Sequence, residues 1–418
     1  MKTKRIVIVG GGVIGLCTAW YARQKGHEVT IVERGALGHD CCSLGNAGFV
    51  TPSHIVPLAA PGMVGMGMRM MFDPESPFWI HPRLDSNLFR WGWRFIRAAT
   101  PAHVNRSAPL LCEMNMASRR CFEEFDALWE NEFGLQKKGM LLLCKTEERL
   151  HEEAEVAEMA GKLGLASEIL TPAQTAEREP NVRMDITGAI YFADDCHMTP
   201  QKFVDSLTRH VQEQGVTIAW SSEVTNWRTN GTRIEAALTP RGDFEADEFV
   251  LSGGSWSAEI VRNLKLSLPL QAGKGYSLTH PTPRCLPTHC SILSEARVAV
   301  TPMGDTLRFG GTMELSGLDL SINPARVRGI LKSVPRYLPD FSPDDFRDVP
   351  VWCGLRPCSP DGLPYVGRFG RFSNLSAATG HAMMGLSLGP ITGKLMSEVL
   401  SDEPPSINIA ALNPDRYA

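Results

Sequence analysis

The sequence predicts an α/β protein with a Rossmann-like βαβ unit at its N-terminus and a mainly antiparallel sheet in its second half. Residues 6–9 form an apolar, β-branched run that is typical of a strand buried on both faces. Gly10, Gly12 and Gly15 follow it with the spacing G-x-G-x-x-G, and helical periodicity then continues to Lys25. From about residue 268 onward, short strand patterns separated by turn residues predominate.

The glycine-rich turn predicts a dinucleotide-binding site. Gly10 allows the tight turn, Gly12 lets a pyrophosphate approach the backbone, and Gly15 lets the helix pack closely on the strand. The first helical residues, Val13 and Ile14, offer unpaired N–H groups at the positive end of the helix dipole. A glycine-rich turn without a ligand is the alternative interpretation.

Glu33 stands at the carboxyl end of a second buried strand, over residues 29–32, and Arg34 follows it. A carboxylate at this place can accept hydrogen bonds from both hydroxyls of an adenosine ribose. The strand, helix, second strand and acidic residue are therefore all in place for a dinucleotide. This pattern alone does not distinguish NAD from FAD.

Two later segments also suit close approach of backbone to a ligand. Ser43, Asn46, Ala47 and Gly48 lie in a loop after the fingerprint, where small residues and one amide favour contact with a flat, polar ligand. A simple turn is the alternative. A buried strand over residues 249–251 ends in a second glycine pair, Gly253-Gly254.

Composition excludes several classes of protein. A net charge of −4 without a long basic run argues against nucleic-acid binding. The 11 cysteines lack the spacing of a zinc site, so we expect no metal. We expect no leader peptide and no transmembrane helix, because the chain starts in a core strand and lacks an apolar run of about 18 residues. Free thiols and a cytoplasmic location follow as expectations.

Residues 58–72 are apolar and contain five methionines. A core segment is the favoured interpretation, and a flexible patch that contacts a membrane or a partner is the alternative. Trp79, Trp91 and Trp93 follow, with arginines between them. Aromatic core packing is favoured there over a membrane-surface face.

The chain resembles the D-amino-acid oxidase superfamily of flavoproteins, and within it the bacterial D-amino-acid dehydrogenases, from about residue 4 to residue 400. The motifs that carry the resemblance are the fingerprint with Glu33, Ser43-x-x-Asn46-Ala47-Gly48, Ala59-Ala60-Pro61-Gly62, Lys274-Gly275-Tyr276-Ser277, Gly354-Leu355-Arg356-Pro357 with Pro360-Asp361-Gly362, and Thr379-Gly380-His381. The resemblance implies FAD rather than NAD.

The resemblance also implies the complete fold: a Rossmann-like FAD-binding domain combined with a discontinuous, mainly antiparallel β-sheet substrate domain, as in D-amino-acid oxidase. The expected FAD-binding domain comprises residues 1–80, 198–265 and 350–418. The expected substrate domain comprises residues 81–197 and 266–349. The flavin ring is then expected between the two domains.

Residue roles carried over from the family complete the expected site. Val224 is expected to contact the adenine through its backbone, and Gly253-Gly254 to lie beside the FAD. Helix N–H groups are expected to face the pyrimidine side of the flavin, from a segment that includes Gly380, His381, Met384 and Gly385. Such groups stabilise the negative charge of the reduced ring.

Arg356 matches the arginine that binds the substrate carboxylate in relatives, and Tyr276 matches a tyrosine of the site wall. His54 and the segment after His381 depart from the commonest dehydrogenase pattern. Both departures resemble a subgroup that acts on D-proline or cis-4-hydroxy-D-proline. The implied reaction is hydride transfer from Cα to flavin N5, for which positioning and desolvation suffice without a protein acid or base.

The implied function is amino-acid catabolism, with electrons passed to a quinone or an electron-transfer protein. Contact with the cytoplasmic face of the inner membrane is a further expectation. The alternatives are a glycine- or sarcosine-type oxidase that uses O2, and a flavin-binding protein without catalytic activity. An NAD-dependent dehydrogenase is a third alternative.

Overall fold

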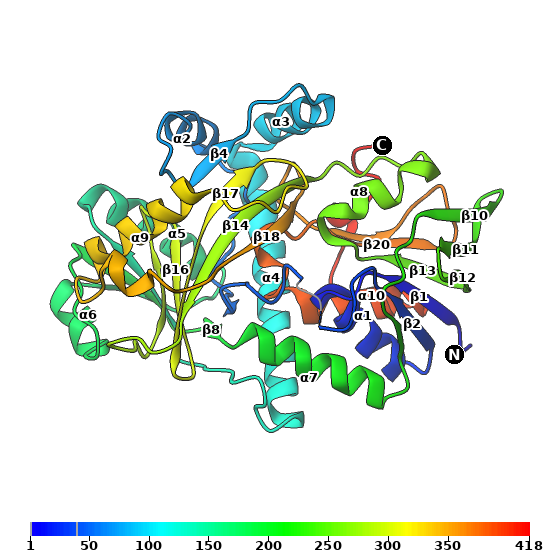
Figure 1. The fold of residues 1–418 in the computed structure, drawn as a ribbon, viewed down its shortest axis with the longest axis horizontal. Helices are drawn as coiled ribbons and strands as arrows, with labels where there is room; N and C mark the ends of the chain where they lie inside the picture. Colours follow the sequence, from blue (N-terminus) through cyan, green and yellow to red (C-terminus); the bar gives the residue numbers. More distant parts are fainter. Residues whose placement is uncertain (1, 39–40) are drawn as a thin grey trace.

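The computed structural model describes residues 2–38 and 41–418, and its two large sheets have a long helix between them (Figure 1). One sheet is almost entirely parallel and the other is mainly antiparallel. The predicted fold class is therefore confirmed.

The parallel sheet has β1 at its centre, and every described residue of β1 after Arg5 is buried. Its strands, in order across the sheet, are β19 (Tyr365–Arg368), β20 (Leu375–Thr379), β13 (Glu248–Leu251), β1 (Arg5–Val9), β2 (Glu28–Val32) and β9 (Thr217–Ala219). Only β19 runs antiparallel to its neighbour. The helix α1 (Val13–Gln24) packs against α10 (Gly389–Leu400) and α7 (Pro200–Glu213).

The larger sheet combines strands from three parts of the chain. Its path is β18 (Val351–Cys358), β14 (Gln271–His280), β17 (Thr306–Leu315), β16 (Val298–Met303), β15 (Cys290–Leu293), β5 (Met140–Cys144), β7 (Gly188–Phe192) and β6 (Ser167–Leu170). A short strand, β4 (Phe78–Ile80), pairs with β17 off this path. The helix α9 (Pro324–Tyr337) packs its apolar residues against one face of this sheet.

The helix α4 (Pro101–Leu128) runs between the two sheets, as the cyan helix of Figure 1 shows. It begins where the Thr100 side chain accepts a hydrogen bond from the His103 N–H, and Pro101 occupies the first turn. Phe125 of α4 packs against Trp20 of α1 and Phe203 of α7. Burial of these large rings holds α4 to the parallel-sheet half of the molecule.

Three elements bear on the expected division into domains, which stays a prediction. β4 and β18 lie in ranges expected for the FAD-binding domain, but both are strands of the larger sheet. α4 lies in a range expected for the substrate domain, but it packs on α1 and α10. Strand pairing and ring packing between distant segments decided these placements, and local sequence patterns carry little information about either.

Two helices, α2 (Met63–Met70) and α3 (Ser86–Ala98), lie along the same edge of the molecule, at the top of Figure 1. The expectation of a core segment over residues 58–72 is wrong for α2, because only Gly67 of this helix is buried. Aromatic core packing holds for Trp91, which is buried, and not for Trp93, which is 62% exposed. Among the described helices, none is both long and apolar enough to cross a membrane.

The remaining elements are small. They are β3 (Phe49–Val50) paired with β8 (Cys196–His197), a sheet of β10 (Asn226–Asn230), β11 (Arg233–Thr239) and β12 (Gly242–Glu245), and the helices α5 (Glu147–Lys162), α6 (Pro172–Arg178) and α8 (Ser257–Ile260).

Candidate functional site

A continuous cavity of about 1230 Å³ extends from the carboxyl ends of β1 and β2 to the inner face of β14 and β18. Ligands of open α/β sheets bind at the carboxyl ends of the strands. A site for one small molecule usually occupies roughly 300–1,000 Å³, so this cavity has room for a large cofactor together with a substrate.

The turn between β1 and α1 has the geometry that the fingerprint predicts. Gly10 has a φ of +112°, and a Cβ atom there would lie 2.5 Å from the Ser252 carbonyl oxygen. A Cβ on Gly15 would lie 2.0 Å from the Gly10 carbonyl oxygen. Gly12 lines the cavity, and its nearest neighbour would be the Ser43 Oγ at 3.8 Å. Gly10 and Gly15 therefore fix the shape of the turn, and Gly12 leaves the backbone accessible to a ligand in the cavity.

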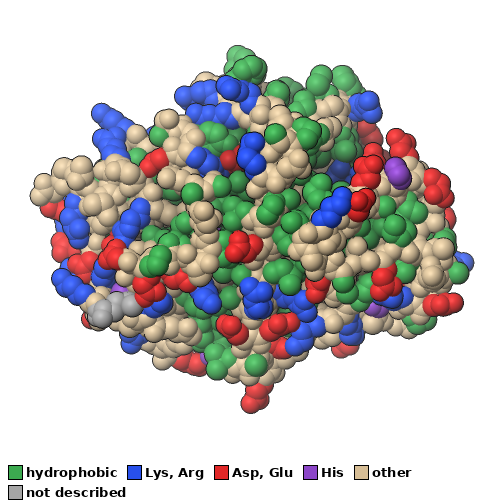
Figure 2. Space-filling model, turned by 180° about the vertical axis from the view of Figure 1, so that it is seen from behind, with side chains coloured by type: hydrophobic (Ala, Val, Ile, Leu, Met, Phe, Trp, Pro, Cys, Tyr) green, Lys and Arg blue, Asp and Glu red, His purple; other side chains and the backbone are tan. Residues whose placement is uncertain are grey.

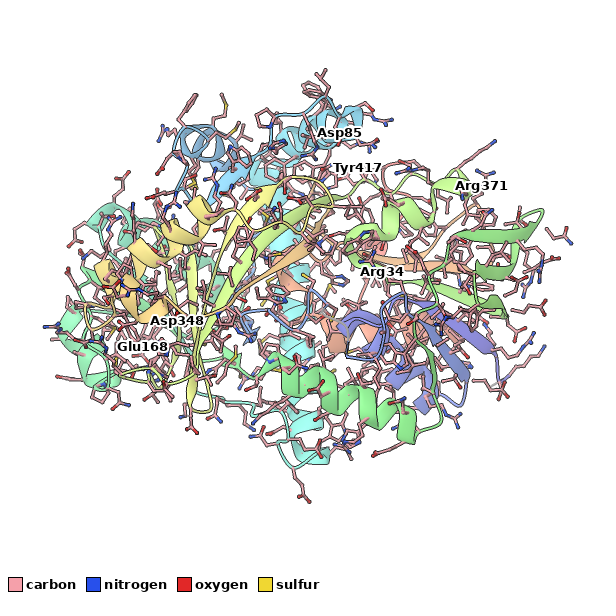
Figure 3. All side chains as sticks on the ribbon, viewed as in Figure 1. Arg34, Asp85, Glu168, Asp348, Arg371 and Tyr417 are labelled. Atoms are coloured by element: carbon pink, nitrogen blue, oxygen red, sulfur yellow. The ribbon has the colours of Figure 1, made fainter. Side chains whose placement is uncertain are left out.

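Glu33 is buried at the end of β2 and lines the cavity. Its carboxylate accepts hydrogen bonds from the Gly11 N–H and the Gly35 N–H, both at 2.7 Å. These two hydrogen bonds fix the carboxylate on the cavity wall, where it could accept hydrogen bonds from a bound ribose. The next residue, Arg34, stacks its guanidinium 3.6 Å from the Trp256 ring centroid, close to α8 (Figure 3).

The cavity brings together most of the predicted residues. Those that line it are Gly10, Gly12, Val13, Ile14, Glu33, Arg34, Ser43, Asn46, Ala47, His54, Val224, Gly253, Gly254, Tyr276, Arg356, His381, Met384 and Gly385. Gly15, Gly48 and Gly380 do not line it. Gly48 and Gly380 have positive φ, and a Cβ on either would collide with Met198 or Tyr365, so the structure gives both a backbone role.

His54 and His381 line the cavity, and the Nδ1 atom of each is buried without a hydrogen-bond partner among the described residues. Burial lowers the pKa of His54 to about 4 and that of His381 to about 3. Both rings are therefore neutral at pH 7. The His381 Nε2 lies 2.9 Å from the Thr392 Oγ1, which orients the ring. Orphaned ring nitrogens in a large, partly apolar cavity fit a flat ligand with a polar edge, such as the flavin of FAD.

Arg356 extends from β18 on the face of the sheet that carries Gly275 and Gly354. A Cβ on Gly275 would lie 2.2 Å from the Arg356 guanidinium, so only glycine leaves space for it. The Arg356 guanidinium donates to the Thr312 carbonyl oxygen at 2.5 Å, and within the described part of the chain no carboxylate pairs with it. Burial lowers the pKa of this group, which nevertheless stays charged.

The carbonyl that orients Arg356 comes from an irregular part of β17. The pairing of β14 with β17 shifts register between Lys274 and Tyr276, and Thr312 has a φ of +72°. Left-handed backbone is unfavourable for a β-branched residue, and such strain is concentrated at functional sites. The bulge therefore aims a carbonyl at the cationic group of the cavity.

The site residues that sequence reasoning missed include Thr312, Trp256 and Trp352. The Trp352 ring fills the space where a side chain on Gly45 or Gly354 would be. The glycines of the sequence could have indicated that another group packs closely against the backbone there. They do not indicate which side chain that group is.

Tyr276 belongs to the part of β14 that lines the cavity, and its side chain is held by two hydrogen bonds. Its hydroxyl donates to the Glu314 Oε2 at 2.9 Å and accepts from the Asn323 N–H at 3.2 Å. Its ring packs in the apolar cluster beneath α9, on the face opposite Arg356. Side chains alternate along a strand, so Gly275 and Tyr276 point to opposite faces. This placement supports a structural role for the ring.

The segment from Gly380 to Gly385 also differs in detail from the expectation. A single 3-10 turn covers Ala382–Met384, and α10 begins only at Gly389. The N–H groups near His381 therefore belong to a turn before the helix. An isolated bridge between Cys358 and His381 connects this turn to the end of β18.

Comparison with known proteins agrees with this geometry. Residues 5–399 match the family model DAO, described as FAD dependent oxidoreductase. The chain is 30% identical to a D-amino acid dehydrogenase of Granulibacter bethesdensis, over 99% of this chain and 100% of that protein. It is also 30% identical to a D-amino acid dehydrogenase of Neisseria meningitidis, over 99% of each chain.

Among solved structures, glycine oxidase from Geobacillus kaustophilus superposes with a TM-score of 0.79 at 22% identity, over 100% of both chains. That similarity shows the fold. The family match covers nearly the whole chain, including every strand of both large sheets. The protein therefore belongs to the DAO family of FAD-dependent oxidoreductases, and its cofactor is FAD.

Proposed function

We propose that this enzyme dehydrogenates a D-amino acid and passes the electrons to a quinone or an electron-transfer protein. The observation that carries the proposal is Arg356, a charged side chain on the cavity wall without a carboxylate partner in the described part of the chain. A buried cation is costly unless an anion pairs with it. The carboxylate of an amino acid is the partner that this position suits, and full-length relatives at 30% identity are D-amino acid dehydrogenases.

The cavity residues divide the work of binding and orientation. Arg356 binds the substrate carboxylate through two parallel hydrogen bonds, and the Thr312 carbonyl keeps the guanidinium in place. The β1–α1 turn and Glu33 hold the nucleotide end of the cofactor. Bound FAD supplies the hydride acceptor. The neutral rings of His54 and His381 add polar contacts to a site from which the surrounding apolar residues exclude water.

Cis-4-hydroxy-D-proline and D-proline are the leading substrates in this proposal. His54 and the segment after His381 support them, because both lie on the cavity wall and both carry the sequence features of that subgroup. A cyclic secondary amine is also compact. It therefore suits a position between Arg356 and the side chains of the 3-10 turn.

An anaerobic screen tests the proposal. The purified yellow enzyme is mixed without O2 with D-amino acids, both prolines and the hydroxyproline isomers, and loss of the oxidised flavin absorbance is recorded. We expect bleaching by at least one D-isomer, fastest with cis-4-hydroxy-D-proline or D-proline. Bleaching by glycine or sarcosine alone, with hydrogen peroxide formed in air, would identify an oxidase instead. A flavin that no amino acid bleaches would show that the protein is not an amino-acid dehydrogenase.

A further inference from the structure

Arg308 of β17 does not line the cavity, and the proposed reaction does not use it. Its Nη1 donates to the Leu44 carbonyl oxygen at 2.8 Å and to the Asn46 carbonyl oxygen at 2.7 Å. Its Nε donates to the Thr279 Oγ1 of β14 at 2.9 Å, which fixes the guanidinium on its own sheet. One side chain of the larger sheet therefore binds two carbonyl groups of the loop over residues 43–48.

The loop over residues 43–48 lies between the two halves of the molecule. The Ser43 Oγ accepts from the Val13 N–H at 3.2 Å, at the start of α1. On the other side, a Cβ on Gly45 would lie 2.1 Å from the Trp352 ring of β18. Three residues of the loop line the cavity: Gly45, Asn46 and Ala47. The loop is therefore part of the cavity wall and is held from both sides.

Each carbonyl group that Arg308 binds shares a peptide bond with the N–H group of a residue on the cavity wall. The Leu44 carbonyl belongs to the same peptide as the Gly45 N–H, and the Asn46 carbonyl to the same peptide as the Ala47 N–H. Within the described part of the chain, neither N–H donates to a protein acceptor. A cation on a carbonyl oxygen polarises the peptide, which makes the N–H a stronger donor. Both N–H groups therefore suit an acceptor atom of a ligand in the cavity.

Arg308 also brings a positive charge that no acidic side chain neutralises. Figure 2 shows Lys and Arg side chains interspersed with Asp and Glu side chains over one face of the molecule, where water screens them. Arg308, in contrast, is partly buried, and it has no carboxylate partner among the residues that the structure describes. Burial lowers its pKa to about 10, so the group is charged at pH 7. Its field therefore acts on the cavity from behind the loop.

We propose that Arg308 is a positioning residue that raises the reduction potential of bound FAD through the loop over residues 43–48. Reduction adds negative charge to the flavin ring, and strong N–H donors with a nearby cation stabilise that charge. A unit charge at roughly 10 Å, in an effective dielectric constant of about 20, changes the stability of a second charge about tenfold. Arg308 should therefore favour binding of reduced over oxidised FAD by about this factor. The proposal requires bound FAD and does not depend on the identity of the substrate.

The two-electron reduction potential of the holoenzyme, measured against reference dyes, tests the proposal without turnover. Arg308→Gln removes the charge and should lower the potential by about 30 mV, which corresponds to a tenfold change in the ratio of the two FAD affinities. Arg308→Lys keeps the charge, so it should retain most of the potential, although titration of the apoprotein should show weaker FAD binding. Arg308→Met, which is also uncharged, takes the place of Arg308→Gln if that variant does not fold.

Arg326→Gln is the matched control. Arg326 of α9 also donates to two backbone carbonyl groups, those of Asp73 and Ser76, but neither of these residues lines the cavity. Its loss should lower stability in urea and leave the potential unchanged.

An unchanged potential in Arg308→Gln, even with weaker FAD binding, would assign Arg308 a purely structural role and overturn the proposal. An equal fall in Arg308→Lys would do the same, because the charge would then have no effect. An equal fall in Arg326→Gln would also overturn it, since any loosening of the fold would then lower the potential.

Discussion

Arg356 is the residue on which the proposed chemistry depends most. Arg356→Leu should lower kcat/KM for the best D-amino acid roughly a thousandfold or more, because the carboxylate would lose its charged partner in a dry site. Arg356→Lys should also lose activity, since an ammonium group cannot form two parallel hydrogen bonds and cannot reach the Thr312 carbonyl in the same way. Steady-state kinetics and the flavin-to-protein absorbance ratio measure the two effects.

The exposed Arg371, labelled in Figure 3, offers a matched control. Arg371→Lys should leave kcat/KM unchanged. FAD content should stay near normal in all three variants. Near-normal kcat/KM in both Arg356 variants would place the carboxylate anchor elsewhere.

Asp195 allows a second prediction at the residue scale, which concerns how the free energy of unfolding depends on pH. It is fully buried, its carboxyl accepts hydrogen bonds from the Ser53 N–H and Oγ, and burial raises its pKa to about 7. An unfolded Asp has a pKa near 3.9, so between about pH 4 and pH 7 the native state holds a proton that the unfolded state releases. This group therefore makes folding less favourable as pH rises through that window.

Asp195→Asn removes this pH dependence. The free energy of unfolding of the variant, relative to the original protein, should rise between about pH 4 and pH 7, by at most about 1.4 kcal/mol per pH unit. Urea unfolding at a series of pH values measures the difference. A difference that stays constant over this range would show that Asp195 is ionised in the native state.

At the residue scale, the sequence is most informative where a motif fixes local geometry. The fingerprint glycines and Glu33 depend on residues close together in the chain, and the structure places them as expected. The roles of Tyr276 and Thr312 depend on which face of the sheet each residue takes. A register shift between β14 and β17 decides this, and no local pattern reveals it.

At the scale of elements, the prediction that can be tested is that the carboxyl end of β2 binds the nucleotide part of FAD through Glu33. Glu33→Ala should weaken FAD binding by about 1.5–3 kcal/mol, because charge-assisted hydrogen bonds to the ribose are lost. The dissociation constant, measured by titrating apoprotein with FAD, should rise roughly ten- to a hundredfold.

Glu33 also accepts hydrogen bonds from Gly11 and Gly35, so the loop itself could change. Glu33→Gln is the control, since its amide oxygen can still accept one of them. It should lose less affinity than Glu33→Ala. Equal retention of FAD through dialysis by Glu33→Ala and the original protein would contradict the assignment.

Helices and strands with a strong hydrophobic periodicity were predictable from the sequence. Those whose burial depends on residues from distant parts of the chain were not. The β1–α1–β2 unit follows from contiguous apolar runs and turn glycines. α2 has equally apolar residues, but its glycines leave little side chain to bury, and only one side packs on Phe78. Hydrophobic content alone therefore did not show whether that segment faces the core or the solvent.

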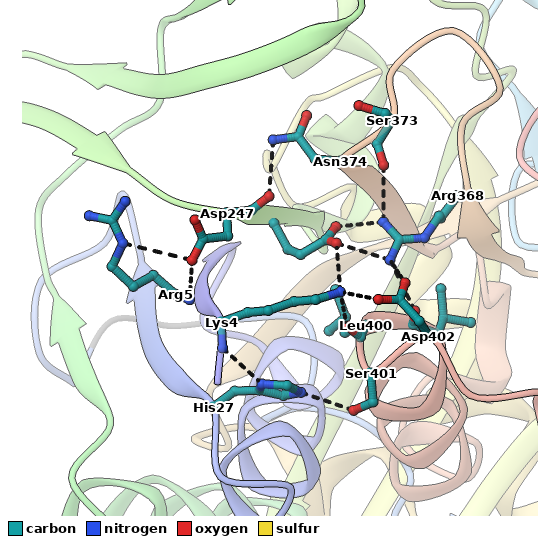
Figure 4. Close-up of polar contacts among 12 residues, drawn as sticks. Lys4, Arg5, His27, Asp247, Arg368, Ser373, Asn374, Leu400, Ser401 and Asp402 are labelled. Atoms are coloured by element: carbon teal, nitrogen blue, oxygen red, sulfur yellow. Dashed lines mark hydrogen bonds and ion pairs between the residues drawn. The ribbon is translucent and has the colours of Figure 1, made fainter. Parts of the chain in front are cut away.

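At the scale of the whole molecule, a charge cluster joins both ends of the chain to the parallel sheet (Figure 4). Glu248 of β13 is buried and accepts from Lys4 Nζ at 3.1 Å and from the Arg368 guanidinium at 2.5 and 3.0 Å. Asp402, just after α10, also contacts Lys4 and Arg368. The cluster therefore connects β1, β13, β19 and α10.

Glu248→Gln should destabilise the protein by about 2–3 kcal/mol, because two partly buried cations lose their shared carboxylate. Urea unfolding measures the loss. Asp243→Asn is the control, since Asp243 pairs with Arg228 on the surface, and its effect should stay within about 0.5 kcal/mol. Equal effects of the two substitutions would show that the cluster adds little to stability.

Fold class and family were predictable at this scale, and the division into domains stays a prediction. The chain passes between the two large sheets several times: β18 joins the larger sheet, whereas β19 and β20, which follow it, join the parallel sheet. Long-range pairing decides such placements, and a single sequence does not record it.

The strand order of the parallel sheet has a consequence for how the protein is made. β1 and β2 leave the ribosome well before β13, which is the other neighbour of β1, and β20 follows only at Leu375–Thr379. At about 5–20 residues per second, the bare edge of β1 waits on the order of tens of seconds for its partner. The nascent chain therefore carries one unpaired edge of β1, whose residues 6–9 are apolar, until β13 has emerged. The cavity that holds FAD is completed later still, because residues as far along the chain as Ser387 line it.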